Sequence, residues 1–439
     1  MSRLIFSFLF LALSISKTTT SSAQELARRA SFDAQISWPD NVLPGAKINS
    51  ISNGSPLEKN GLKAGDIILS VNNRFVGDQE DWSAITYAIR ANTETIIQVK
   101  RGNDLIKKSV RLNALPLEEN KKVETFYEVV VNDYGSRQRS IITKPKSKDK
   151  LPAIILIQGL SCSSVEKYSG RSNNWVKLIQ DLAEKSNMVL MRIEKPGVGD
   201  SEGDCGKTDF ITELSGYESA LQVLKNKSYV DTTKIVVYGN SMGSAIAPYL
   251  VNKYNLAGVI SDGTFFKSWY EHMLEIERRI LEIEGKSQAE IYTLMNEVYI
   301  PLYHGMLIEK KSFEEILEQN PTYRKPHRQG LNHMYGRSVE YYHQIQEFNF
   351  AQAWEEIKVP VRIRWGTNDW IMSEFDNDMI VDMLEKSGHE DHELYKYPNM
   401  DHWSTIHPDY SSSFNFKPGK WEDKISQQII DWAWGIVGK

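Results

Sequence analysis

The segment from Val236 to Gly243, V-V-Y-G-N-S-M-G, constrains the fold of this chain more than any other part of the sequence. An apolar β run leads into a turn that sets Ser241 between two glycines, and residues 245–250 then follow a helical pattern. A strand that turns this sharply into a helix strains the backbone of its central residue, while the flanking glycines let strand and helix approach closely. We therefore expect the Ser241 hydroxyl to be exposed above a sheet, beside a helix N-terminus.

The sequence around this turn predicts an α/β architecture. Short apolar runs alternate with helix-length segments over residues 120–439, a pattern typical of a mostly parallel sheet covered on both faces. The expected strands are residues 126–131, 139–143, 153–157, 188–193, 234–238, 257–261, 361–365 and 393–397. The first two are expected to pair antiparallel. Residues from about 265 to 355 break the rhythm with a long helical pattern, which predicts a helical cap inserted into the sheet domain.

The G-N-S-M-G string in its strand–turn–helix context resembles the nucleophile turn of the α/β hydrolases. That family orders its catalytic residues as nucleophile, acid and histidine. Asp369 follows a strand in W-G-T-N-D-W, and His402 follows the last strand in N-M-D-H-W. The resemblance implies a triad of Ser241, Asp369 and His402 that forms an acyl-enzyme and hydrolyses it. The family usually has glycine before this histidine, whereas this chain has Asp401.

Two alternative site residues stay open: His407 as the base, and Asp262, at the end of another strand, as the acid. The remaining histidines lie in the cap or precede the last strand, and so are out of the family order: His272, His304, His327, His333, His343, His389 and His392.

The resemblance also implies an oxyanion hole made of two backbone N–H groups, those of Met242 and Leu160. Leu160 follows Gln158-Gly159, which stands where related sequences often have His-Gly. The glycine-rich string over residues 194–203, E-K-P-G-V-G-D-S-E-G, resembles the loop after the fourth strand of many α/β hydrolases. We interpret it as a structural turn, since no P-loop lysine pattern follows it.

Residues 30–115 predict a separate β-rich unit. Strand patterns cover residues 46–51, 67–71, 95–101 and 105–112, and a helical pattern covers residues 81–90. The string G-S-P-L-E-K-N-G-L-K-A-G-D over residues 54–66 resembles the PDZ domains of bacterial envelope proteases. The resemblance implies a peptide ligand added as a strand. The loop that would hold the peptide carboxylate, expected at residues 31–36, lacks glycine and carries Asp33, so a scaffold or substrate-gating role is an alternative.

The first residues predict export. A positive charge at Arg3, an apolar run over residues 4–15 and small residues ending at Ala23 are typical of a secretory signal peptide over residues 1–23. No later apolar run is long enough for a membrane span, so we expect a periplasmic or secreted protein. Cys162 and Cys205 fall on two loops at the same end of the predicted sheet, and in an oxidising compartment such a pair is expected to form a disulfide.

Composition and motifs exclude several function classes. With 52 Lys+Arg against 57 Asp+Glu and a net charge of -5, the chain lacks the basic excess of a nucleic-acid-binding protein. It has no metal-binding motif of histidines or cysteines, and no cofactor is expected. We expect an exported serine hydrolase that cleaves carboxylic esters. The alternatives are a serine peptidase of the same fold that recruits peptides through its PDZ-like domain, and an inactive binding protein with a hydrolase fold.

Overall fold

A computed structural model of the 439-residue chain describes residues 25–38, 44–167, 173–324 and 334–438. The predicted signal peptide, residues 1–23, lies outside the described residues. Within the described ranges, no helix has the length and apolar character needed to cross a bilayer.

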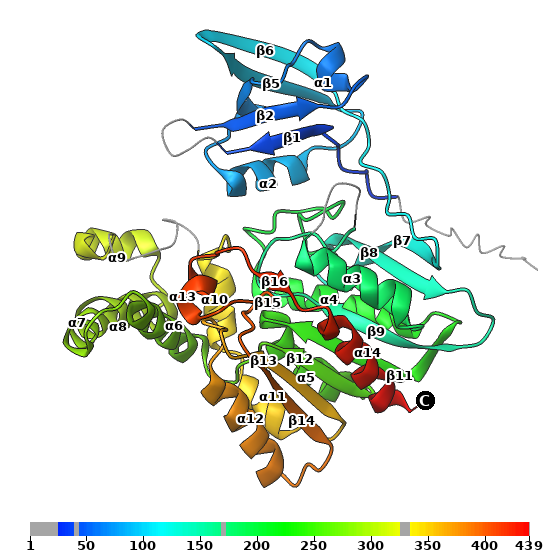
Figure 1. Ribbon diagram of the computed structural model, residues 1–439, viewed down its shortest axis with the longest axis vertical. Coiled ribbons are helices and arrows are strands. Elements are labelled where there is room, and N and C mark those ends of the chain that lie inside the picture. The colour runs from blue at the N-terminus through cyan, green and yellow to red at the C-terminus, as the bar shows by residue number, and fades with distance from the viewer. Residues whose placement is uncertain (1–24, 39–43, 168–172, 325–333, 439) are drawn as a thin grey trace, which may run out of the picture.

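The larger of the two main sheets has eight strands in the order β14-β13-β12-β11-β9-β10-β8-β7 (Figure 1). Its pairings are parallel from β14 to β10, and β8 and β7 extend it antiparallel. The strands are β7 (Val123–Val131), β8 (Arg137–Pro145), β9 (Leu151–Ile157), β10 (Val189–Ile193), β11 (Val230–Asn240), β12 (Gly258–Asp262), β13 (Val361–Gly366) and β14 (His392–Tyr397). The predicted α/β fold, with its antiparallel first pair, is confirmed.

Both faces of this sheet are buried. Along β9, Ile155 and Ile157 join one apolar cluster, whereas Ile154 and Leu156 join a second cluster on the other face. This alternation follows from the two-residue period of a strand. The first cluster includes buried residues of α4 (Phe210–Lys225), α5 (Met242–Tyr254) and α12 (Glu374–Lys386), and the second includes those of α3 (Asn174–Lys185) and α14 (Lys424–Val437).

The strand order fixes where the loops meet. Strand β9 has β10 on one side and β11 on the other, so the connections that leave β9 and β11 run to opposite sides. Such a reversal opens a crevice beyond the carboxyl ends of the strands, where α/β proteins bind their ligands. The segments after β9, β11, β12, β13 and β14 all emerge at this edge.

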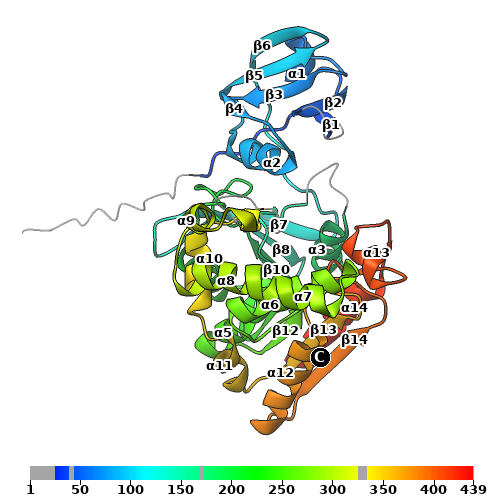
Figure 2. The ribbon, with the colours of Figure 1, turned by 90° about the vertical axis from the view of Figure 1, so that its left-hand side faces the viewer.

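A helical cap connects β12 to β13, as the sequence predicts, and Figure 2 shows α6, α7 and α8 in front of the larger sheet. Three of its helices begin with the same capping box, in which a serine and a glutamate three residues later exchange hydrogen bonds with the backbone: Ser268 with Glu271, Ser287 with Glu290, and Ser312 with Glu315. The cap elements are α6 (Trp269–Ile283), α7 (Gln288–Leu294), η1 (Met295–Tyr299), α8 (Ile300–Tyr303), η2 (His304–Ile308), α9 (Phe313–Gln319), η3 (Pro321–Arg324), α10 (Val339–Gln346) and α11 (Phe350–Glu355).

The N-terminal unit has a six-stranded, antiparallel sheet in the order β1-β2-β3-β5-β6, with β4 paired to β3. Its elements are β1 (Ala34–Ser37), β2 (Ala46–Ile51), α1 (Pro56–Lys59), β3 (Ile67–Val71), β4 (Arg74–Phe75), α2 (Gln79–Ala88), β5 (Glu94–Arg101) and β6 (Asp104–Arg111). A separate apolar cluster forms its core, so this unit folds around residues of its own.

The interpretation of residues 31–36 as a carboxylate-holding loop is wrong in its extent. Residues from Ala34 onward pair with β2 as the edge strand β1, and only Ser31 to Asp33 remain irregular. Asp33 has a positive φ of 48°, and the Ser31 hydroxyl donates to its carboxylate at 2.5 Å. A negative side chain therefore occupies the turn before the edge strand.

The N-terminal unit is joined to the larger domain by buried ion pairs. Arg28 donates to Asp200 at 2.9 Å and to Glu166 at 2.6 Å, and both carboxylates are almost completely buried. The Arg29 N–H donates to the second oxygen of Asp200 at 2.9 Å. The Tyr127 hydroxyl adds a hydrogen bond to Glu166 at 2.5 Å.

Replacing Arg28 should destabilise the protein, because two buried carboxylates would lose a cation. We expect Arg28→Met to lower the free energy of unfolding by about 3 kcal/mol. Urea denaturation followed by tryptophan fluorescence measures the change. Lys177→Met removes an exposed ion pair with Asp423 and should leave the midpoint almost unchanged. Equal midpoints for both variants would contradict a structural role for Arg28.

Candidate active site

The site is built around Ser241, the residue between β11 and α5. Its backbone has φ 54° and ψ -126°, a strained conformation for a residue with a side chain. A Cβ on Gly243 would lie 2.1 Å from the Ile157 carbonyl oxygen, and one on Gly239 would lie 2.3 Å from the Gly243 carbonyl oxygen. Any side chain at these two positions would clash with the backbone, so the tight turn requires both glycines.

Asp369 and His402 form a hydrogen-bonded pair at the same edge of the sheet. His402 Nδ1 lies 2.8 Å from Asp369 Oδ2. The other carboxylate oxygen accepts the backbone N–H groups of Ile371 and Met372, each at 2.9 Å. Burial disfavours the charged form of His402, but the neighbouring Asp369 carboxylate outweighs this and raises the pKa of the imidazole above its usual value.

The loop that carries His402 is organised by Asp401, the residue that stands where the family usually has glycine. One Asp401 oxygen accepts the N–H groups of Trp403 at 2.9 Å and Thr405 at 2.7 Å. The other oxygen lies 3.0 Å from His407 Nε2. Asp401 thus closes a turn around the histidine, and its negative charge contributes to the raised pKa of His402.

Ser241 and His402 line one cavity with Asp262 (volume about 680 Å³). Among the described residues, no hydrogen bond links the Ser241 hydroxyl to the imidazole. Such contacts are often loose until substrate binds. Leu160 and Met242 also line the cavity, and a Cβ on Gly159 would lie 2.9 Å from Ser241 Cβ, so the loop after β9 lies against the serine.

The two alternative site residues have other partners. His407 is held by Asp401 and does not line the cavity. Asp262 does line it, but its carboxylate is bound by the buried guanidinium of Arg364 and by the Tyr238 hydroxyl at 2.9 Å. Neither residue contacts His402 through a hydrogen bond in the described parts of the chain.

The remaining histidines are mostly bound to backbone or surface groups. His343 Nε2 contacts the Met306 carbonyl, His389 Nε2 contacts the Val359 carbonyl, and His392 Nδ1 contacts the His389 carbonyl. His304 lies near Glu309, and His327 and His333 lie outside the described residues.

His272 is a cavity residue that sequence reasoning set aside because it lies in the cap. Its ring stacks on Phe265 with 4.3 Å between ring centroids, and it lines the cavity. Burial lowers the pKa of His272 to about 3, so this imidazole is neutral at pH 7. No local sequence pattern indicates that His272 lines the cavity, because its position depends on how α6 packs over the sheet.

The cavity wall is mainly apolar and aromatic. Its large side chains come from distant parts of the chain: Trp175, Phe265, Trp269, Ile276, Trp403 and Trp421. Of the cap aromatics, Trp269 and Tyr335 reach the cavity, whereas Tyr303, Tyr341 and Tyr342 are completely buried in the core. Among the described lining residues Asp262 is the sole carboxylate, and no lysine or arginine is present.

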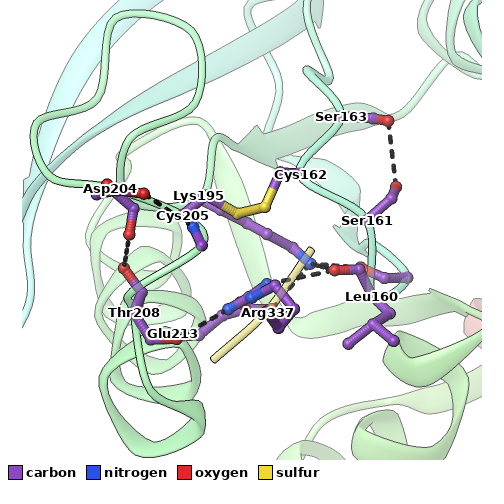
Figure 3. Close-up of a disulfide and its surroundings, with 12 residues drawn as sticks. Leu160, Ser161, Cys162, Ser163, Lys195, Asp204, Cys205, Thr208, Glu213 and Arg337 are labelled. Carbon is purple, nitrogen blue, oxygen red and sulfur yellow. Dashed lines mark hydrogen bonds and ion pairs between the residues drawn. A yellow bond between two sulfur atoms is a disulfide. The ribbon is translucent and has the colours of Figure 1, made fainter. Parts of the chain in front are cut away.

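The predicted disulfide is confirmed: Cys162 and Cys205 are bonded, with 6.0 Å between their Cα atoms (Figure 3). Cys162 follows Leu160 closely on the loop after β9, and Cys205 lies on the connection that leads to α4. The bond therefore tethers the loop that carries the candidate oxyanion donor. In the described ranges, no group of three or more His, Cys, Asp or Glu side chains could hold a metal ion.

Comparisons with known proteins agree with this fold. Residues 19–112 match a PDZ domain, and residues 165–409 match the family described as serine aminopeptidase, S33. A search of curated proteins found no significant match.

Solved structures with a similar fold include three esterases. An esterase of Pyrococcus furiosus is 12% identical, with 74% of this chain and 98% of that chain covered and a TM-score of 0.44. Est1E from Butyrivibrio proteoclasticus, solved with ferulic acid, is 14% identical, with 72% and 100% covered and a TM-score of 0.45. Acetyl xylan esterase 1 from a Thermoanaerobacterium species is 14% identical, with 73% and 86% covered and a TM-score of 0.42.

The family match spans more than half of the chain and includes the serine turn, the Asp369 loop and the His402 loop. This protein therefore belongs to the serine aminopeptidase S33 family of α/β hydrolases and is a serine hydrolase that carries an N-terminal PDZ domain.

Proposed function

We propose that the protein hydrolyses carboxylic esters through an acyl-enzyme on Ser241. The observation that carries this proposal is the Asp369–His402 pair, held at 2.8 Å, whose imidazole lines the same mainly apolar and aromatic cavity as a serine with a strained backbone. A serine hydroxyl needs such an oriented base, because an alcohol is a weak nucleophile at neutral pH.

The proposed reaction gives each of these groups one role. His402 Nε2 takes the proton of the Ser241 hydroxyl as its oxygen attacks the ester carbonyl, and Asp369 stabilises the resulting imidazolium. The N–H groups of Met242 and Leu160 donate to the negative oxygen of the tetrahedral intermediate. His402 then gives its proton to the departing alkoxide, and a water molecule repeats the sequence on the acyl-enzyme to release the acid.

The charge of the cavity favours an ester over a peptide with a free amino terminus. An aminopeptidase must bind an ammonium group, and burying one without a carboxylate partner is costly. Asp262, the sole carboxylate among the described lining residues, is already bound to Arg364 and Tyr238. A neutral acyl group needs no carboxylate partner in the cavity.

We further propose that the protein is exported and that its PDZ domain acts as a scaffold. The signal-peptide pattern and the disulfide support export. Asp33 would repel a peptide carboxylate at the turn before β1, and the Arg28 ion pairs attach the domain firmly to the hydrolase.

Ser241→Ala should abolish labelling by a fluorophosphonate probe and reduce turnover of p-nitrophenyl esters by at least about 10⁴-fold, since the acyl-enzyme cannot form. Gel fluorescence and absorbance assays measure the two effects. Ser411→Ala, which alters an exposed serine of α13 (Tyr410–Phe414), should retain both activities. Labelling that persists in Ser241→Ala would disprove the assignment of the nucleophile.

The substrate proposal predicts a preference between two esters that differ in charge. N-acetylphenylalanine ethyl ester should be hydrolysed with a kcat/KM about 10-fold higher than phenylalanine ethyl ester, because the latter places an ammonium group in the cavity. Titration of the released acid measures both rates. A preference for the free amine would instead support an aminopeptidase.

The activity should be lost as the pH falls through the raised pKa of His402, because the protonated imidazole cannot accept the serine proton. Asp401→Asn removes a negative charge that contributes to this raised pKa, so the acidic limb of kcat/KM should move to lower pH. The asparagine oxygen can still accept the Trp403 and Thr405 N–H groups. An unchanged or upward-shifted limb would contradict this role of Asp401.

A further inference from the structure

The peptide bond between Gly159 and Leu160 is bound through its carbonyl group by a buried cation, Lys195. A trans peptide is planar, and its C=O and N–H groups point in opposite directions. The direction of the Leu160 N–H therefore depends on where the Gly159 carbonyl is held. That carbonyl accepts a short hydrogen bond from Lys195 Nζ, which also donates to the Leu160 carbonyl at 3.1 Å.

Lys195 has a completely buried side chain and extends from the segment after β10 toward this loop (Figure 3). Glu213 of α4 compensates its charge, with 3.0 Å between Lys195 Nζ and Glu213 Oε1. A buried lysine with one carboxylate partner and two carbonyl acceptors has all three of its donor hydrogens directed at an acceptor.

Arg337 joins Lys195 and Glu213 in what we call the Lys195–Glu213–Arg337 cluster. Its guanidinium donates to the Leu160 carbonyl at 3.2 Å, to the Thr208 carbonyl at 3.2 Å, and to Glu213. It also lies over the Tyr341 ring, with 4.0 Å to the centroid. Two cations from different parts of the chain thus converge on the Leu160 carbonyl, and Lys195 also holds the Gly159 carbonyl.

The Leu160 N–H is left available for the substrate. Leu160 lines the cavity, and in the described parts of the chain no acceptor is found for this N–H. The peptide belongs to no strand or helix, so no ladder of backbone hydrogen bonds fixes its rotation. The disulfide at Cys162 tethers the loop two residues further along the chain and does not involve the Gly159–Leu160 peptide itself.

We propose that Lys195 is a positioning residue for the oxyanion hole: by holding the Gly159 carbonyl, it directs the Leu160 N–H toward the oxyanion and polarises the peptide so that this N–H donates more strongly. The inference rests on the proposed ester hydrolysis at Ser241. Lys195 touches neither the substrate nor the reacting atoms. Lys195 would lower the energy of the transition state, in which negative charge forms on the carbonyl oxygen of the substrate.

The pH dependence follows from the groups around Lys195. Burial lowers the pKa of Lys195 to about 8, although Glu213 opposes this shift and Arg337 adds to it. The neighbouring tyrosine hydroxyls, those of Tyr217, Tyr341 and Tyr342, have pKa values raised by burial and stay neutral in this range. Lys195 is therefore charged below about pH 8 and neutral above it, so kcat should fall as the pH rises through this value.

The test compares Lys195→Met with the wild-type protein. The variant keeps the length of the side chain, and Arg337 still compensates Glu213. We expect kcat to fall by about 10- to 100-fold, less than when an oxyanion donor itself is removed, with KM changed by less than about 3-fold. Affinity for a trifluoromethyl ketone, which forms a tetrahedral adduct with serine, should fall in parallel with kcat/KM. The alkaline limb of kcat should disappear.

Lys253→Met is the matched control. Lys253 also pairs with a glutamate, Glu218 at 2.6 Å, but at the C-terminal end of α5, away from the cavity. This variant should keep the wild-type kcat and alkaline limb. A merely structural role of Lys195 predicts parallel losses of stability and active fraction, with kcat per fluorophosphonate-labelled site unchanged.

The outcomes separate this inference from the proposed function. A wild-type protein without Ser241-dependent ester turnover would overturn the proposed function. An active wild-type protein together with a Lys195→Met variant of normal kcat and pH profile would overturn the inference alone. If Lys195→Met does not fold, the pH dependence of the wild-type kcat is the test. A kcat that stays constant from pH 7 to 9.5 would overturn the inference about Lys195, and a fall near pH 8 would support it.

Discussion

The site depends on the close contact between the start of α5 and the end of β9. A Cβ on Gly243 would lie 2.1 Å from the Ile157 carbonyl oxygen, so only a glycine lets the helix approach the strand this closely. The same contact brings the loop after β9 against Ser241, and Met242 and Leu160 both line the cavity. One steric constraint thus sets both the nucleophile and the groups proposed to bind the oxyanion.

Much of this arrangement could be predicted from local sequence. Ser241, Asp369 and His402 stand in short motifs whose order is that of the family, and buried strands produce apolar runs that are readily recognised. The small sheet of β15 (Thr405–Ile406) and β16 (Lys420–Trp421) could not be predicted, because two residues carry no periodicity. Trp421 and His272 reach the cavity only through tertiary packing, which no local pattern records.

The buried lysine and arginine beside the site could not be predicted from the sequence either. A lysine or arginine in a sequence is expected at the surface, since burying an unpaired charge is very unfavourable. Lys195 and Arg337 are nevertheless completely buried, because Glu213 on α4 offers each of them a carboxylate oxygen. The contact from Arg337 to the Leu160 carbonyl spans 177 residues, a separation at which sequence pattern gives no information.

The N-terminal unit reaches the same loop through a second set of buried charges. Arg28 binds Glu166, and the Glu166 N–H donates to the Ser164 hydroxyl, which in turn donates to the buried carboxyl of Glu194, the residue before Lys195. Burial raises the pKa of Glu194, and the hydrogen bonds from Ser164 and Val165 hold this carboxyl beneath the loop. A continuous series of polar contacts therefore runs from the PDZ domain to Glu194, the residue that precedes Lys195 in the chain. Because Glu166 and Asp200 are both almost completely buried, separating the two units at Arg28 would remove one cation partner from each of these carboxylates, which is costly inside a protein.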